Sequence, residues 1–193
     1  MGNTKTKIHI PPDQLQEYST ISGLSEREVR DFLQVFLSEY PSGEVTKEDF
    51  VEENIKAHGG HLQMWNHIFN VLDKDENGLL DAKDFLIACN IGVNGTPEEK
   101  LYFAFKVYDI DGNGYIDYFE FSQLFHFTFG NFQISDNSLG SEQDFAMEDK
   151  ELSEKCRKIF SRLDKNERGK ISMPEFVHGL RDDPVMIASF TLF

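Results

Sequence analysis

The chain has 193 residues, which is enough for one domain or for two small lobes in tandem. Hydrophobic residues make up 39% of it and 18 residues are Phe, which favours a packed core and argues against a disordered chain. The formal net charge of -15 repels phosphate backbones, so nucleic acid is not expected as a partner. The chain has two cysteines without CxxC spacing, which predicts a cytoplasmic protein. It has no apolar run of about twenty residues, so we expect no membrane span.

The N-terminus carries a possible lipidation signal. Residues 1–6 read MGNTKT, which matches the short pattern for N-myristoylation. We expect residues 1–22 to form an N-terminal arm in which Gly2 carries the acyl chain once Met1 has been removed. One myristoyl chain binds membranes weakly and reversibly, so this pattern predicts a protein that is peripheral on membranes. The alternative is an ordinary flexible N-terminus.

Four copies of one unit follow along the chain, each with a 12-residue loop, and the loops begin at residues 38, 73, 109 and 164. These are loops 1 to 4. Apolar residues at helical spacing precede each loop, and residues 25–28 and 96–99 read as capping boxes. The eighth loop position is always apolar and can form a short strand bridge to a partner loop: Val45, Leu80, Ile116 and Ile171. A Gly-, Ser-, Asn- and Asp-rich stretch from 130 to about 148 predicts a flexible connector.

Two of the loops carry a complete set of oxygen ligands for calcium, with glycine at the sharp sixth position. The expected ligands in loop 3 are Asp109, Asp111, Asn113, the Tyr115 carbonyl, Asp117 and Glu120. Those in loop 2 are Asp73, Asp75, Asn77, the Leu79 carbonyl, Asp81 and Asp84. The last ligand of loop 2 is one methylene shorter than Glu, and a short carboxylate suits six-coordinate magnesium better. We therefore expect loop 2 to bind Ca²⁺ more weakly than loop 3, or to share its site with Mg²⁺.

The other two loops depart from the motif. Loop 4 keeps Asp164, Asn166 and Glu175 but has Arg168 at the fifth position, where an acceptor oxygen is needed. Calcium binding is therefore not expected in loop 4. Loop 1 has Ser, Tyr and Ser at its first three ligand positions, so we expect a degenerate loop kept for packing.

Helix–loop–helix units around calcium loops are EF-hands, and one unit cannot bury its own apolar face. The sequence therefore predicts an all-α fold of four EF-hands in two pairs, the first hand degenerate. We expect residues 23–94 to hold hands 1 and 2, residues 95–183 to hold hands 3 and 4, and residues 184–193 to form an apolar C-terminal tail.

Residues 2–6, 41–43, 73–85 and 108–116 together resemble the neuronal calcium sensor family, which includes recoverin, frequenin and the guanylyl cyclase-activating proteins. The resemblance implies two EF-hand pairs and a sensor that regulates a target protein. Tyr40 in place of the family's usual Cys, the altered loop 4 and the long connector indicate a divergent member. A calcineurin B-like or calcium-and-integrin-binding-like regulatory subunit and a simple calcium buffer are the alternatives. The chain has no nucleophile motif, phosphate-binding glycine loop or His pair at metal spacing, so we do not expect an enzyme.

A calcium sensor needs a surface for its target. Sensor hands open on calcium binding and expose an apolar groove, which takes an amphipathic helix of the partner. The candidates in the first pair are Phe32, Phe36, Phe50, Ile55, Trp65, Phe69 and Phe85. The alternative is that these side chains belong to the core.

Overall fold

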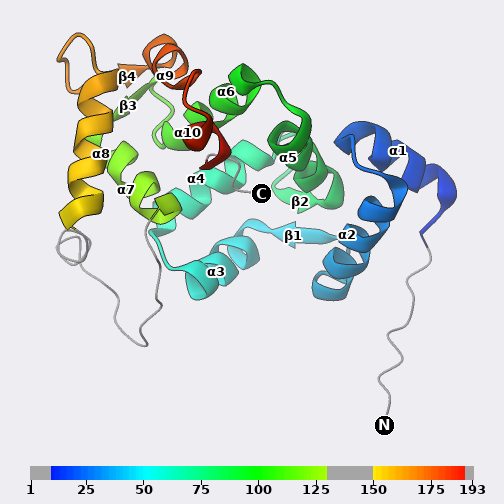
Figure 1. The fold of residues 1–193 in the computed structure, drawn as a ribbon. Helices are drawn as coiled ribbons and strands as arrows, with labels where there is room; N and C mark the ends of the chain where they lie inside the picture. Colours follow the sequence, from blue (N-terminus) through cyan, green and yellow to red (C-terminus); the bar gives the residue numbers. More distant parts are fainter. Residues whose placement is uncertain (1–9, 130–149, 190–193) are drawn as a thin grey trace.

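The structure is a computed structural model that describes residues 10–129 and 150–189. Gly2, the predicted connector and residues 190–193 lie outside this part. The elements, in chain order, are α1 (Pro12–Ser22), α2 (Glu26–Glu39), β1 (Glu44–Thr46), α3 (Lys47–His58), α4 (Leu62–Leu72), β2 (Leu79–Asp81), α5 (Ala82–Asn94), α6 (Pro97–Tyr108), β3 (Tyr115–Asp117), α7 (Tyr118–Phe129), α8 (Lys150–Leu163), β4 (Lys170–Ser172), α9 (Met173–Leu180) and α10 (Pro184–Ser189) (Figure 1). Among the described residues, no helix is both long and apolar enough to cross a membrane.

The loops are joined in pairs by short antiparallel strands, as the apolar eighth positions predict. Strand β1 places Val45 opposite Leu80 of β2, and β3 places Ile116 opposite Ile171 of β4. All four side chains are buried. The predicted all-α fold with two EF-hand pairs is therefore confirmed.

Helix starts follow the local sequence. The Ser25 hydroxyl accepts the N–H of Glu28 at 3.3 Å, and the Glu28 carboxylate accepts the N–H of Ser25 at 2.8 Å, so α2 begins with the predicted capping box. Thr96 and Glu99 form the same arrangement before α6, with Pro97 at the first helical position. Such caps are worth about 1 kcal/mol each.

Part of the predicted N-terminal arm is folded. Helix α1 packs against α2 and α5, and Leu15 is buried in the contact. The amides of Asn90 and Asn94 on α5 donate to the carbonyls of Ile21 and Ser22, at 2.9 Å and 3.2 Å. These amides satisfy carbonyls at the C-terminal end of α1, which a helix leaves without internal partners. Residues 12–22 are therefore an additional helix of the first pair.

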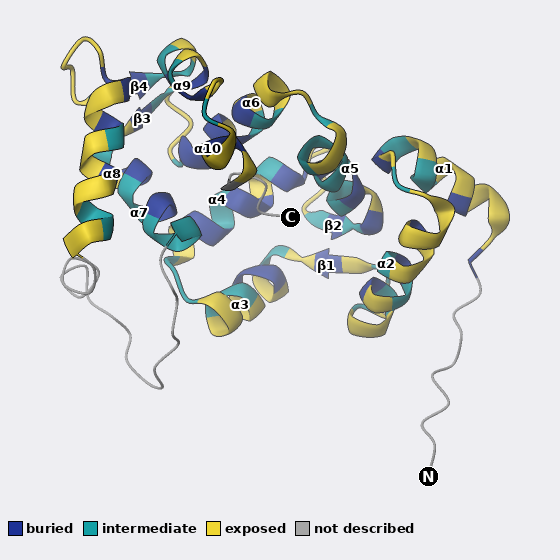
Figure 2. Cartoon of the chain, in the orientation of Figure 1, coloured by how far each residue is buried: buried dark blue, intermediate teal, exposed yellow. Residues whose placement is uncertain are grey.

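The cores of the two pairs are rich in Phe and continue into each other (Figure 2). Helix α4 of the first pair packs against α6 of the second. Trp65 on α4 meets the ring of Phe127 on α7 edge-on, with centroids 5.3 Å apart. His67 Nε2 on α4 lies 2.7 Å from the carbonyl oxygen of Lys106 on α6. The contact between pairs therefore involves both helices of hand 3.

The described part of the C-terminal tail also packs on the second pair. Helix α10 lies against α6, and its Met186 and Ile187 side chains are buried. Burial thus explains the apolar sequence at this point, since removing each such side chain from water stabilises the fold by about 1.5–3 kcal/mol.

Candidate metal centre

Loop 3 is held between two helices and a strand. Helix α6 ends with Asp109 as its C-cap residue, β3 follows, and α7 begins at Tyr118. Gly114 has a φ of 84°, a left-handed conformation that costs an L-residue roughly 1–2 kcal/mol. Its position is otherwise open, since an added Cβ would meet nothing within 4 Å. The glycine is therefore required by the turn and not by crowding.

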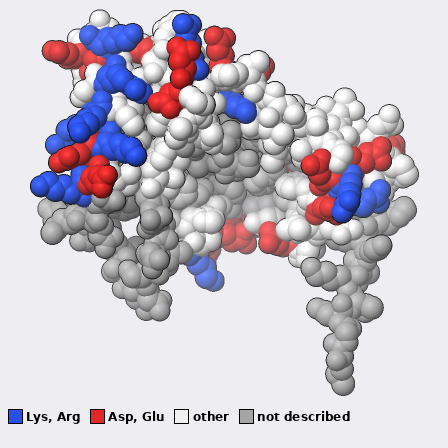
Figure 3. All heavy atoms as spheres, in the orientation of Figure 1, with Lys and Arg blue, Asp and Glu red and all other residues white. Residues whose placement is uncertain are grey.

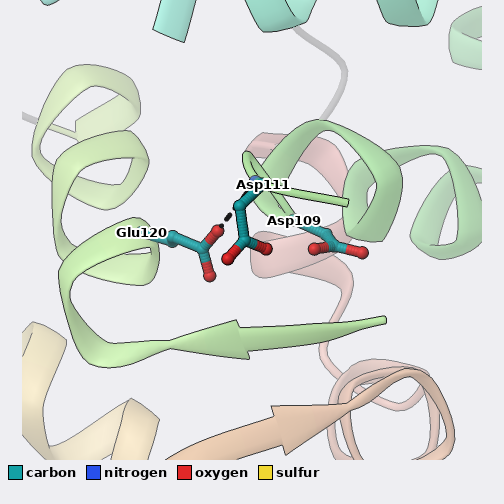
Figure 4. A group of neighbouring side chains, drawn as sticks. All are labelled: Asp109, Asp111 and Glu120. Atoms are coloured by element: carbon teal, nitrogen blue, oxygen red, sulfur yellow. Dashed lines mark hydrogen bonds between the residues drawn. The ribbon is translucent and has the colours of Figure 1, made fainter. Parts of the chain in front are cut away.

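Three acidic side chains of this loop turn toward one another (Figure 4). Ligand oxygens of Asp109, Asp111 and Glu120 all lie within 4.8 Å of one another, from the end of α6, the loop and the first turn of α7. Within residues 10–129 and 150–189 this is the one such group of possible metal ligands. Three carboxylates this close repel one another unless a cation or protons lie between them.

The hydrogen bonds leave room for a cation. Glu120 accepts two backbone N–H groups, from Asp117 at 2.9 Å and from Asp111 at 3.2 Å, so its carboxylate crosses the loop. Asp109 Oδ2 accepts the N–H of Gly114 at 2.9 Å. Asp109 Oδ1 is buried and has no hydrogen-bond partner. A buried acceptor without a partner is costly, and a divalent cation is the group that these oxygens fit.

Electrostatics support the same interpretation. Burial raises the pKa of Asp109 and of Glu120 above their ordinary values, although backbone N–H groups act in the opposite direction. Neighbouring carboxylates in the loop add to the increase. The site therefore holds negative charge that is unfavourable by itself and that a bound cation would stabilise.

The remaining predicted ligands of loop 3 lie in the same turn. The Asn113 side chain bonds the carboxylate of Asp111 and the N–H of Tyr115, at 2.7 Å and 2.9 Å. Asp117 Oδ1 accepts the N–H of Glu120 at 2.9 Å. These contacts fix the loop shape, and the bonds to the N–H groups of Tyr115 and Glu120 are those that short polar side chains make to the backbone two or three residues ahead.

Loop 2 has the same framework as loop 3 with two differences, at Asp73 and at Asp84. Asp73 is buried and accepts the N–H groups of Asn77 and Gly78, at 3.1 Å and 2.9 Å. Asp75 and Asn77 bond each other, and Asn77 accepts the N–H of Leu79. Asp84 accepts the N–H of Asp81 at 3.0 Å in a helix capping box. Within the described residues, Asp84 makes no hydrogen bond like the one that Glu120 makes across loop 3 to the N–H of Asp111.

The predicted groove residues of the first pair are mostly interior. Four are buried, namely Phe36, Phe50, Trp65 and Phe69, and three are half-buried, namely Phe32, Ile55 and Phe85. Ile55 also lines a shallow hollow between α3 and α4, together with Val51 and the exposed Leu62. The predicted lipidation residue, Gly2, lies outside the described residues.

Two side chains make structural contacts that no sequence motif predicts. In hand 1 the Tyr40 hydroxyl donates to the carboxylate of Glu53, which ties the end of α2 to α3. In loop 4 Arg168 forms an ion pair with Glu175 at 3.1 Å. The Arg168 substitution itself was visible in the sequence, but its partner was not, because only the folded loop brings the two charges together.

Comparison with known proteins agrees with the geometry. The family described as an EF-hand domain pair matches residues 98–181, which contain loops 3 and 4. The chain is also 28% identical over 184 residues to the calcium-binding protein NCSA of Dictyostelium discoideum. That similarity covers 94% of this chain and 98% of the relative, so it extends over both pairs.

Proposed function

We propose that this chain, an EF-hand protein and, as predicted, a relative of the neuronal calcium sensors, is a calcium sensor that regulates a target protein through ions bound in loops 2 and 3. The observation that carries this proposal is the group of Asp109, Asp111 and Glu120 with its buried, unpartnered oxygen. Calcium would supply two positive charges at the point where these carboxylates meet. A regulatory role, and no catalysis, fits both matches.

The path from loop 3 to the rest of the molecule runs through α7 and α4. Glu120 lies in the first turn of α7, and Phe127 on the same helix contacts Trp65 on α4. The Trp65 indole N–H donates to the carbonyl of Gly59 at 2.7 Å, in the turn between α3 and α4. A shift of α7 would therefore act on the turn that sets the angle between these two helices and on the hollow that they form.

Fluorescence of Trp65 tests the sensor, because it is the one Trp of the chain and lies at the contact with α7. We expect calcium to change its emission and to increase binding of a hydrophobic dye, and we expect Glu120→Gln to abolish both effects. Glu98→Gln, the same change at an exposed position of α6, is the matched control and should behave like the wild type. Calcium uptake measured by calorimetry without either optical change would reject a sensor.

Calcium uptake without a change in Trp emission or dye binding would favour a calcium buffer, the second candidate function. One observation supports it, since four of the seven predicted groove side chains are buried. A buffer binds calcium without presenting new apolar surface, so dye binding separates the two functions. A regulatory subunit of the calcineurin B type would instead copurify with its partner in chelator as well as in calcium.

Reversible membrane association is part of the proposal and rests on the Gly2 pattern. The described structure adds a group of basic side chains. Lys and Arg side chains gather over α8 in Figure 3 with acidic side chains among them, and Lys155, Arg157, Lys158 and Arg162 are exposed on a chain of net charge -15. Arg162 also lies 3.6 Å from Asp183. Cations near an anionic leaflet contribute about 1 kcal/mol each, so this face could orient an acylated molecule.

Vesicle sedimentation tests the membrane step. Acylated protein and Gly2→Ala should be compared in calcium and in chelator, with vesicles that contain phosphatidylserine. We expect the acylated protein to sediment in one of the two conditions and Gly2→Ala to remain in the supernatant in both. Equal sedimentation of the two proteins would remove the lipid anchor from the proposal without affecting the calcium sites.

A further inference from the structure

Loop 4 differs from a complete calcium motif at one side chain. Asp164, Asn166, Gly169 and Glu175 occupy their motif positions, and Arg168 is the exception. The backbone has kept the shape of a calcium loop. Its fourth and sixth positions have φ angles of 51° and 72°, and the corresponding positions of loop 3 have 69° and 84°. The fourth position is a Glu both in loop 4 and in loop 2, where Glu76 has a φ of 57°, and a left-handed conformation is unfavourable for this residue, so both loops keep the shape at a cost.

Arg168 contacts the side chains that would hold a metal ion in this loop. Its guanidinium Nη2 donates to Glu175 Oε2 at 3.1 Å, the carboxylate that would be the last metal ligand. The amide of Asn166 donates to the other oxygen of Glu175 at 2.5 Å. Asp164 accepts the backbone N–H groups of Arg168 and Gly169, at 3.1 Å and 2.7 Å. A positive charge from the chain itself therefore lies among the ligand positions.

The same cation also reaches loop 3. The Arg168 guanidinium carbon lies 5.8 Å from the centroid of the Tyr115 ring, and Lys170 Nζ lies 4.1 Å from it. Both distances fit cation–π contacts. Tyr115 is paired with Ser172 across β3 and β4, and its carbonyl is the predicted seventh-position ligand of loop 3. Two cations of loop 4 thus hold a residue that loop 3 needs for its ion.

We propose that Arg168 is an internal cation that closes hand 4 in place of a metal ion and, through the Tyr115 ring, positions the carbonyl ligand of loop 3. The part about Tyr115 rests on the proposed calcium site in loop 3, whereas the part about loop 4 does not. Hand 4 is then a support that needs no calcium, and hand 3 alone responds to the ion in the second pair. Arg168 is a positioning residue, since it acts through Tyr115 and does not bind calcium.

The first test counts calcium ions by isothermal calorimetry on the full chain. Arg168→Asp completes the motif of loop 4, so we expect one more calcium ion per chain than in the wild type. Lys165→Asp makes the same change of charge at the second loop position, which is not a ligand, and should add none. If Arg168→Asp adds no ion while the wild type still binds calcium, the internal-cation role is wrong. A wild type that binds no calcium would instead reject the proposed function.

The second test measures calcium affinity in loop 3. We expect Arg168→Ala and Tyr115→Leu each to weaken it by about two- to fivefold, the range of one exposed cation–π contact. Arg168→Lys keeps the positive charge and should retain part of the calcium affinity that Arg168→Ala loses. The double variant Arg168→Ala with Tyr115→Leu should lose no more than the larger single loss. Additive losses, or no loss in an Arg168→Ala protein that melts cooperatively, would overturn the positioning role.

Discussion

Adding one methylene to the last ligand of loop 2, by Asp84→Glu, should change the metal ion that this loop prefers. Glu120 reaches across loop 3 to the N–H of Asp111, at 3.2 Å, while it also caps α7 through Asp117. Asp84, at the same position of loop 2, caps α5 through Asp81 at 3.0 Å. Asp84→Glu would lengthen this side chain so that both of its oxygens can reach an ion. The larger coordination shell that results suits calcium and not magnesium.

The size of the effect follows from one additional charged contact. If a second carboxylate oxygen on the ion is worth what a hydrogen bond to a charged group is worth, about 1.5–3 kcal/mol, calcium affinity should rise about 10- to 150-fold. Calorimetric titrations with calcium, in the absence and presence of magnesium, measure the change. They are best made on a background in which Glu120→Gln has weakened loop 3, so that the heat comes from loop 2.

The reciprocal variant is the control for this prediction. Glu120→Asp shortens the carboxylate of loop 3 and should give it the weaker calcium binding and the magnesium competition that we expect of loop 2. Loop 2 and loop 3 would then have exchanged their preferences. An unchanged ratio of calcium to magnesium affinity in Asp84→Glu would show that side-chain length at this position does not set the choice, and the argument from reach would fail.

Three further predictions concern stability and reactivity. Since burial raises the pKa of Asp109 and Glu120, these groups destabilise the calcium-free fold at neutral pH, and that penalty should lessen as the pH falls toward their ordinary values of 3.8 and 4.5. Urea unfolding in chelator should show a smaller effect of pH in Glu120→Gln. Ile116→Ala removes a fully buried side chain and should lower the free energy of unfolding by about 2–5 kcal/mol in the same assay. Burial raises the pKa of both thiols, that of Cys156 to about 11, but Cys156 is fully buried and Cys89 only half-buried, so alkylation at neutral pH should modify Cys89 first.

The sequence predicts the local features of this fold well, because they depend on a few adjacent residues. The capping box at Ser25 follows from two side chains three residues apart, and the pairing of Val45 with Leu80 follows from a fixed place in each loop. The convergence of Asp109 and Glu120 likewise follows from a turn whose shape the glycine determines.

Contacts between distant segments are the part that the sequence does not reveal. Nothing in the pattern of residues 12–22 indicates that Asn90 will bond the last turn of α1, because an isolated Asn on a helix has no fixed partner. The contact of Trp65 with Phe127 is similar, since both read as ordinary apolar helix positions. The sequence does not reveal the burial of the predicted groove residues for the same reason, because the spacing indicates an apolar face but not which segment covers it.

The two loops with complete calcium motifs belong to hands that follow each other in the chain. Hands 2 and 3 are consecutive, and they contribute α4, α5, α6 and α7, the helices through which the two pairs touch. The outer hands carry side-chain bonds instead, Tyr40 with Glu53 in hand 1 and Arg168 with Glu175 in hand 4. Ions in loops 2 and 3 would thus act on helices that meet each other, while the outer hands keep their shape without an ion. A change in the contact between pairs, more than the opening of either pair alone, is therefore the response that this arrangement favours.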